Sequence, residues 1–326
     1  MTETYLLRAM LEFAFDSEQE YLAGPKNLPA RFGPFLVDYS PNSEFYLMDL
    51  GLLEPDSIAG SPNWEYPVSL LYVETEIEVP GAIKASFPED QHPQDAADDI
   101  LEQLEAMFRL FQKGHVYLGR HKVWHLRDEV PKQVIFLPHR PVKAEPATLY
   151  HRGQYRLDDE TLVKFIEFFS SYWDIVHRKP EPLCNALYRF SSSYERRTLV
   201  DRLTELVVAL EALFGDSGSG GDSLAYKIAL RCSCLLYPPS EARSRAFKAI
   251  RKIYTDRSKI LHGRRLDAKH TGEETLDQLE EFLRWAIIKF LEQYKKGDPI
   301  SSGEEIDNLL FFRKVEKLED GYPQNA

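Results

Sequence analysis

The sequence predicts an α+β protein, with a β-rich N-terminal domain that contains one helix and an all-helical bundle that follows it. Roughly the first 90 residues are rich in Pro, Gly, aromatic and β-branched residues, whereas from 157 onward apolar residues recur at the helical period. Pro138, Pro141 and Pro146 separate the two patterns, and 326 residues suit about two domains. We therefore assign 1–150 to an acidic α+β domain with a sensor or regulatory role, 151–296 to a helical bundle and 297–326 to a C-terminal tail.

The N-terminal domain contains one clear strand and one clear helix. Residues 69–79 end in alternation of apolar residues with acids, which is typical of a strand with one wet face, and Pro80-Gly81 ends it. From Gln94 to Gln112 the apolar residues follow a period of 3.6, with Gly114 as a stop, so this segment is predicted to be a helix. Shorter strands are expected at 116–118 and 134–137.

The second half of the chain is almost wholly helical in pattern. A helix begins with acids at 157–160 and carries an apolar face up to Trp173. The remaining helices are expected, between proline and glycine breaks, at about 183–192, 194–214, 223–236, 241–261 and 273–295. In the tail, the apolar run 309–312 is expected to dock on the body of the protein.

Composition excludes several classes of protein. Hydrophobic residues make up 43% of the chain, but no apolar run approaches the roughly 18 residues of a membrane-spanning helix. The acidic N-terminus lacks the features of a secretion signal, so we expect a cytoplasmic protein with no membrane contact. Three cysteines without a Cys-x-x-Cys pair support neither a disulfide framework nor a four-thiolate zinc site.

Charge is distributed unevenly along the chain. The formal net charge is −12, yet residues 196–296 hold 19 lysines and arginines against 14 acids. Within this stretch, residues 243–265 hold nine basic residues and a single acid, Asp256. Such a run is either a solvated helix face or a surface that binds phosphates. For the second case, the expected RNA-binding residues are Arg251, Lys252, Lys259, Arg264 and Arg265.

An Arg-x4-His motif lies at the end of the helix predicted at 241–261. Arg257 and His262 are five residues apart, which is about 7.5 Å of rise and about 140° of rotation on an α-helix, so both can flank one phosphate. Gly263 can cap the helix, and the last helical turn favours a protonated imidazole. Arginine supplies a donor fork that matches phosphate oxygens, and histidine moves protons near neutral pH. The pair is a minimal set of groups for metal-independent RNA cleavage.

The motif is accompanied by segments that resemble the Apea-like branch of the HEPN superfamily. These segments are 186–190, 201–214, Tyr226-Lys227, Arg231 and 253–263, and a looser similarity covers 108–114. The resemblance implies a helical bundle that forms a homodimer, with two Arg-x4-His motifs facing each other across an RNA-binding cleft. It also implies a metal-independent endoribonuclease without a cofactor, of the kind found in phage defence and toxin–antitoxin pairs, with an antitoxin or trigger molecule as a further partner.

The resemblance also implies residue roles. His262 would act as general acid or base on the ribose 2′-hydroxyl or the leaving 5′-oxygen, and Arg257 would stabilise the phosphorane, leaving a 2′,3′-cyclic phosphate and a 5′-hydroxyl. Ser258 stands where active members often carry Asn, Asp or His, and its hydroxyl can still form a hydrogen bond. The alternatives are a non-catalytic HEPN module that binds nucleic acid, a nucleotide or a partner protein, and a purely structural dimerisation bundle.

Other side chains are candidates for supporting this site. Glu211 lies on an otherwise apolar helix face and Arg231 follows an apolar run, and a buried charge needs a partner. We expect Glu211 to pair with Arg231 or Arg257 and to orient the site; the alternative is a surface carboxylate. Tyr254 and Asp256 flank the motif, where they would contact RNA, contact the second subunit or only cover the helix surface. His121 and His125 are four residues apart, with His115 and His139 nearby, but no cysteine or acid stands at helix spacing as a third ligand and the region has a β-like pattern, so no metal site is expected.

Overall fold

The computed structural model divides the chain into two compact units, Met1–His177 and Arg178–Ala326. Most of the described residues are helical, and strands lie only in the first unit among them. The structure describes residues 2–14, 31–41, 68–80, 91–114, 116–125, 132–134, 155, 158–196, 198–215, 222–261, 273–300 and 303–312.

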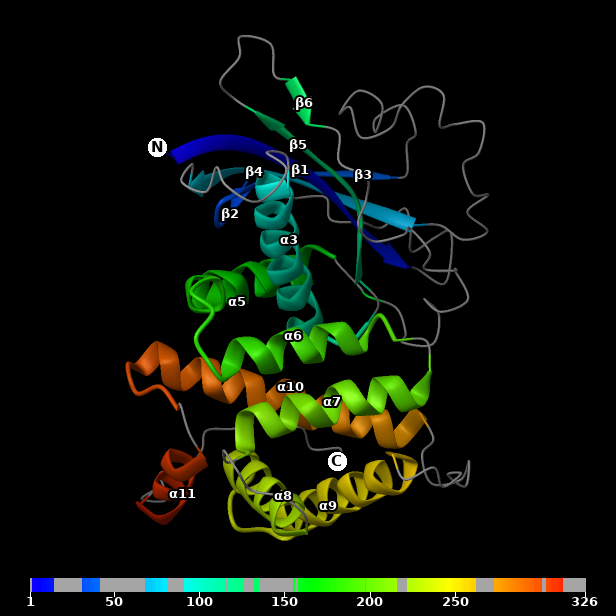
Figure 1. Cartoon of the computed structure of the whole chain (residues 1–326), viewed down its shortest axis with the longest axis vertical. Coiled ribbons are helices and arrows are strands. Elements are labelled where there is room, and N and C mark those ends of the chain that lie inside the picture. Colours follow the sequence, from blue (N-terminus) through cyan, green and yellow to red (C-terminus); the bar gives the residue numbers. More distant parts are fainter. Residues whose placement is uncertain are drawn as a thin grey trace. The chain divides into compact units, whose positions relative to one another are not determined.

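A sheet of six strands lies in the first unit, and each pair of neighbouring strands is antiparallel (Figure 1). Its order is β2-β3-β4-β1-β5-β6, and the strands are β1 (Thr2–Ala14), β2 (Arg31–Phe32), β3 (Phe35–Pro41), β4 (Val68–Pro80), β5 (Val116–His125) and β6 (Lys132–Val134). The strand predicted at 69–79 is β4. The strand predicted at 116–118 continues to His125, and of the strand predicted at 134–137 only Val134 lies within the described residues.

In the described part of this unit two helices accompany the sheet, α3 (Gln91–Phe111) and α5 (Asp159–His177), and they meet through aromatic side chains. Phe108 of α3 stacks on Phe165 of α5 with ring centroids 4.0 Å apart. Phe32 of β2 lies edge-on against both Phe165 and Phe169. Gly33 has a positive φ of 52°, and a Cβ there would lie 2.5 Å from the Phe169 ring, so the turn after β2 requires glycine.

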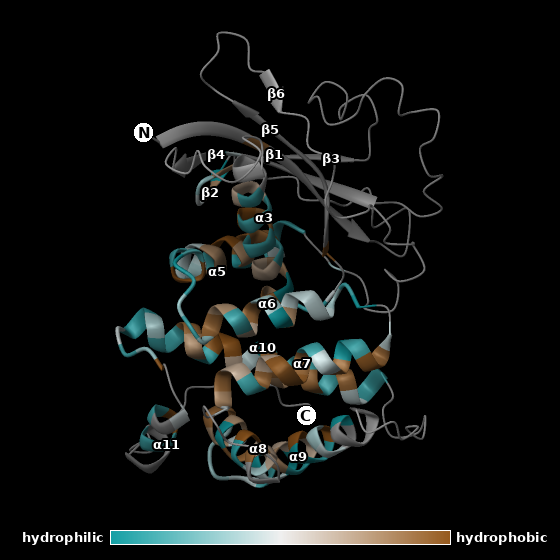
Figure 2. Ribbon diagram, in the orientation of Figure 1, coloured by the Kyte–Doolittle hydropathy of each residue, from teal (hydrophilic) through white to brown (hydrophobic). Residues whose placement is uncertain are grey.

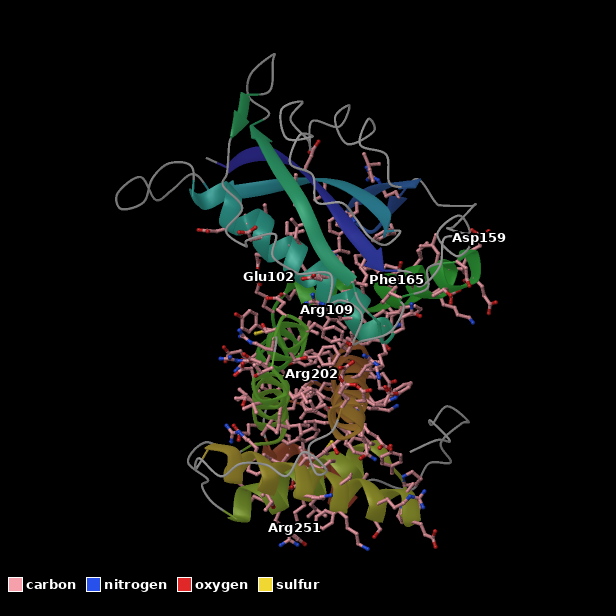
Figure 3. The ribbon with its side chains drawn as sticks, turned by 90° about the vertical axis from the view of Figure 1, so that its right-hand side faces the viewer. Glu102, Arg109, Asp159, Phe165, Arg202 and Arg251 are labelled. Atoms are coloured by element: carbon pink, nitrogen blue, oxygen red, sulfur yellow. The ribbon has the colours of Figure 1, made fainter. Side chains whose placement is uncertain are left out.

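The two compact units meet after His177, and α5 lies in the first of them, whereas the sequence predicts a boundary near residue 150 with this helix in the bundle. The difference arises because the apolar face of α5 is completed by aromatic residues distant in sequence. A buried ion pair also lies in this unit: Arg109 Nη2 donates to Glu105 Oε1 at 2.7 Å and to the Val116 carbonyl at 3.2 Å, which joins α3 to β5 (Figure 3).

Six helices lie in the described part of the second unit: α6 (Leu183–Ser193), α7 (Leu199–Phe214), α8 (Asp222–Leu236), α9 (Glu241–Leu261), α10 (Glu273–Lys296) and α11 (Gly303–Phe312). Each of the five helices predicted between 183 and 295 is confirmed to within a few residues. One boundary differs: α7 begins at Leu199 because the Thr198 hydroxyl accepts a hydrogen bond from the Asp201 N–H and caps the helix.

The C-terminal helix α11 packs within this unit through residues that precede the apolar run 309–312, and the side chains of that run, for which docking is predicted, lie outside the described set. Ile306 is fully buried, and Asp307 receives two hydrogen bonds from Arg231 of α8. Hydrophobic and hydrophilic residues alternate along the helices of this unit (Figure 2). Among the described residues, no helix is long and apolar enough to cross a lipid bilayer.

Candidate functional site

Glu211, Tyr254 and Arg257 form one cluster between α7 and α9. The Tyr254 hydroxyl donates to Glu211 Oε1, and Arg257 Nη1 donates to the same oxygen at 3.0 Å. Tyr254 and Arg257 are three residues apart on α9 and therefore share a side of the helix. The guanidinium carbon of Arg257 lies 5.9 Å from the centroid of the Tyr254 ring. Of the two partners predicted for Glu211, Arg231 and Arg257, the structure shows Arg257.

The cluster is only partly shielded from solvent. The Arg257 and Glu211 side chains are 20% and 26% exposed, so solvent and solutes still reach them. Burial raises the pKa of the Tyr254 hydroxyl well above its usual range, and the hydrogen bond to Glu211 and its charge raise this pKa further. Tyr254 therefore stays protonated at neutral pH and acts as a donor to the carboxylate.

The Arg257 guanidinium keeps donor capacity after it has bound Glu211. Its Nε is buried and has no hydrogen-bond partner among the described residues. A guanidinium presents five N–H groups in a rigid plane, and the hydrogen bond to Glu211 is made by Nη1. Glu211 and Tyr254 thus hold this plane in a defined orientation without using all of its donors.

Arg231, the other expected partner of Glu211, binds a different acid. Its Nε and Nη2 donate to the two Asp307 carboxylate oxygens at 2.9 and 2.7 Å, and its Nη1 donates to the Phe214 carbonyl at 2.7 Å. The side chain is buried. Arg231 therefore joins the C-terminal end of α7 to α11, because that helix end offers an unpaired carbonyl and α11 offers a carboxylate.

The remaining predicted site residues fall into two groups. Arg251 and Lys252 are exposed on α9, and Arg251 projects away from the bundle in Figure 3. Asp256, Ser258 and Lys259 lie in α9, but their side chains are outside the described set. His262, Arg264 and Arg265 lie outside the described residues, and α9 is helical up to Leu261, the residue before His262.

The structure also contains a buried ionic cluster that the sequence analysis did not identify. Glu280 of α10 accepts hydrogen bonds from Arg202, from Arg284 at 2.8 Å and from the Tyr194 hydroxyl at 2.5 Å. All four side chains are almost fully buried. The available signal was the position of Arg202 on the apolar face of its helix, together with the four-residue spacing of Glu280 and Arg284. This cluster lies toward the opposite end of α7 from Glu211, since Arg202 and Glu211 are nine residues apart, about 13 Å of helix.

The hydroxyl of Tyr254 yields a first testable prediction. Tyr254→Phe keeps the ring beside Arg257 but removes the hydrogen bond to a charged carboxylate, and we expect it to lower the free energy of unfolding by about 1–2 kcal/mol. Urea unfolding followed by circular dichroism measures the change. Tyr188→Phe on the exposed side of α6 is the matched control and should change stability by less than about 0.5 kcal/mol. Equal losses in both variants would contradict the role assigned to the Tyr254 hydroxyl.

No group of three or more His, Cys, Asp or Glu side chains in the described ranges is arranged to hold a metal ion. Comparisons of the chain with protein-family models, with curated proteins and with solved structures found no match.

Proposed function

We propose that this protein is a metal-independent endoribonuclease in which Arg257 and His262 act on the phosphate that is cleaved. The observation that carries the proposal is the arginine held by Glu211 and Tyr254 in the helical turn before His262. A partly exposed guanidinium with a fixed plane and remaining donors suits the non-bridging oxygens of a phosphodiester. The proposal includes the HEPN-like character of the bundle, which rests on the motif and its neighbouring segments.

The chemistry requires one group that takes a proton and one that gives a proton. A neutral His262 removes the proton from the ribose 2′-hydroxyl, whose oxygen forms a bond to phosphorus. The bond from phosphorus to the 5′-oxygen breaks, and that oxygen takes a proton from a protonated His262. Arg257 stabilises the negative charge of the phosphorane. The products are a 2′,3′-cyclic phosphate and a 5′-hydroxyl.

Two copies of the chain supply the two protonation states that this mechanism needs. A homodimer that brings two Arg-x4-His motifs to one cleft places a neutral and a protonated imidazole on opposite sides of the phosphate. In this proposal Glu211 positions Arg257 and does not touch the RNA. The enzyme would act in the cytoplasm as a defence or toxin-like effector, controlled by an antitoxin or a trigger molecule.

The basic surface of α9 supplies affinity for the RNA backbone. Arg251 and Lys252 are exposed, and no acid occurs between Ala242 and Thr255. Each lysine or arginine that neutralises a phosphate releases counterions, so binding should weaken steeply as the salt concentration rises.

The direct test uses the purified full chain and an end-labelled single-stranded RNA in the presence of excess EDTA. We expect discrete fragments whose 3′ ends are cyclic phosphates, detected by their resistance to a phosphatase until acid has opened the ring. Because the mechanism uses no metal, EDTA should leave the rate unchanged within about twofold. RNA that is bound but stays whole would instead support a non-catalytic module, and cleavage abolished by EDTA would contradict the mechanism.

A further inference from the structure

An exposed apolar ridge runs along α8 beside α9. Tyr226 and Leu230, one helical turn apart, are 48% and 38% exposed. The ring of Tyr226 lies edge-on against Phe247 of α9, with centroids 5.4 Å apart and planes at 79°. The two helices lie side by side within this unit (Figure 1). The exposed ring and its apolar neighbour are therefore available to a ligand that presents an apolar or π surface.

Positive charge accompanies this ridge. Lys248, Arg251 and Lys252 are exposed on α9 close in sequence to Phe247. Neither 242–255 on α9 nor 223–236 on α8 contains an aspartate or a glutamate, although the whole chain carries a net charge of −12. The surface therefore combines aromatic rings with cationic side chains, and the acids of the two helices lie at or near their ends, at Asp222, Glu241 and Asp256.

Phe247, whose ring contacts Tyr226 of the ridge, lies on the same helix as Arg257 of the candidate cleavage site. Phe247, Arg251 and Tyr254 follow the spacing i, i+4, i+7 and so share one side of α9. Phe247 precedes Arg257 by ten residues, which is about 15 Å along the helix axis. A strand of nucleic acid with one phosphate at Arg257 can therefore extend along α9 and bring a base a few nucleotides away to the ridge.

We propose that Tyr226 and Phe247 form a stacking platform for bases of single-stranded RNA that lie a few nucleotides from the cleaved phosphate. The inference rests on the proposed function and specifies its substrate: bases in a duplex are already stacked on each other, so only an unpaired segment can use the platform. Cationic residues beside aromatic rings match a polyanion with π-faces. A second copy of this chain fits less well, because a two-fold contact through the ridge would place Lys248 and Arg251 against like charges.

The test compares two oligonucleotides that the proposed chemistry cannot cut. One is a 2′-O-methyl RNA, and the other is an abasic strand of the same length and charge. The dissociation constants of the full-length protein for both are measured by fluorescence anisotropy at one salt concentration. We expect the RNA to bind about 5- to 100-fold more tightly than the abasic strand, which is the effect of stacking one base on an aromatic side chain.

The variants locate this preference on the ridge. Tyr226→Leu keeps an apolar side chain but removes the ring. We expect this variant to bind the RNA and the abasic strand with dissociation constants within about threefold of each other. Its dissociation constant for the abasic strand should equal that of the wild type. Tyr226→Phe keeps the ring and should restore the preference. Tyr188→Leu is the matched control, since Tyr188 is an exposed tyrosine of α6 and lies outside the platform.

The outcomes separate the platform from the proposed nuclease. Equal binding of both strands by the wild type overturns the platform, while the cleavage assay with natural RNA still decides the nuclease. A preference that survives Tyr226→Leu overturns it as well. Light scattering shows whether Tyr226→Leu changes the mass of the protein in solution. If the mass changes while the preference for RNA over the abasic strand remains, the ridge is a contact between copies of the chain, and the platform is overturned. Base-dependent binding lost only in Tyr226→Leu supports the platform even if no RNA is cut.

Discussion

Replacing His262 by alanine is expected to lower the rate of RNA cleavage by about 10²- to 10⁴-fold, the range for loss of a general acid or base. In the proposed mechanism this imidazole both takes the 2′ proton and supplies the proton to the leaving 5′-oxygen, so alanine removes both steps in every copy. Single-turnover rates on a labelled RNA measure the effect. Binding of an uncleavable 2′-O-methyl RNA should stay within about threefold of the wild-type value, because the other contacts with phosphate remain.

Arg257→Ala is expected to lower the same rate by about 10²- to 10³-fold, since it removes a charge held against the phosphorane. The matched control is Arg245→Ala on the same helix, because the Arg245 side chain is mostly exposed and its ion pair with Glu241 spans 3.8 Å. That control should change only the salt-dependent binding of RNA. Arg257→Lys keeps a charge but loses the planar fork, and we expect it to recover only part of the rate.

Circular dichroism and light scattering of both variants show whether fold and oligomeric state are preserved. Rates that remain near the wild-type value in His262→Ala would remove the catalytic assignment and leave a binding module. An equal loss in Arg245→Ala and Arg257→Ala would mean that α9 contributes general positive charge and that Arg257 has no special position.

The helices could be predicted because the signals that define a helix lie within its own segment of the sequence. Apolar residues at the helical period define the bodies of α8, α9 and α10, and prolines and glycines mark their ends. The start of α7 was missed because Tyr194 continues an apolar pattern, whereas the Thr198 cap sets the first turn. The division of the chain was also missed, since it depends on Phe165 meeting Phe108 and Phe32 from distant segments.

The candidate site shows the same distinction between local and distant information. A carboxylate on an apolar helix face indicated a buried partner, and Glu211 does bind Arg257. The partner of Arg231 could not be predicted, because Asp307 is 76 residues away in a helix of the tail. Arg231 and Arg257 are thus equivalent candidates for Glu211 in the sequence, and only the packing of the helices assigns each arginine its own acid.

The buried cluster around Glu280 leads to the largest expected effect on stability. Arg202 of α7 reaches Glu280 and also Asp277, at 3.2 Å from the latter. Arg284 binds Glu280 and the Tyr194 hydroxyl, each at 2.8 Å, and donates to Glu281 at 3.1 Å. One carboxylate therefore balances two buried guanidinium groups, and it joins α10 to α7 and to the end of α6.

Glu280→Ala is expected to lower the free energy of unfolding by about 3–5 kcal/mol, because it leaves two buried cations without the charge that they share. The partial partners Asp277 and Glu281 are more exposed and cannot replace it. Glu281→Ala, the neighbouring acid on the same helix, should cost about 1 kcal/mol or less, since its charge is screened by solvent. Urea unfolding of both variants provides the comparison, with Glu280→Gln as the version that keeps the side-chain volume. Similar losses at positions 280 and 281 would show that the cluster is held by packing, whereas a much larger loss at 280 assigns the joining of these three helices to its charge.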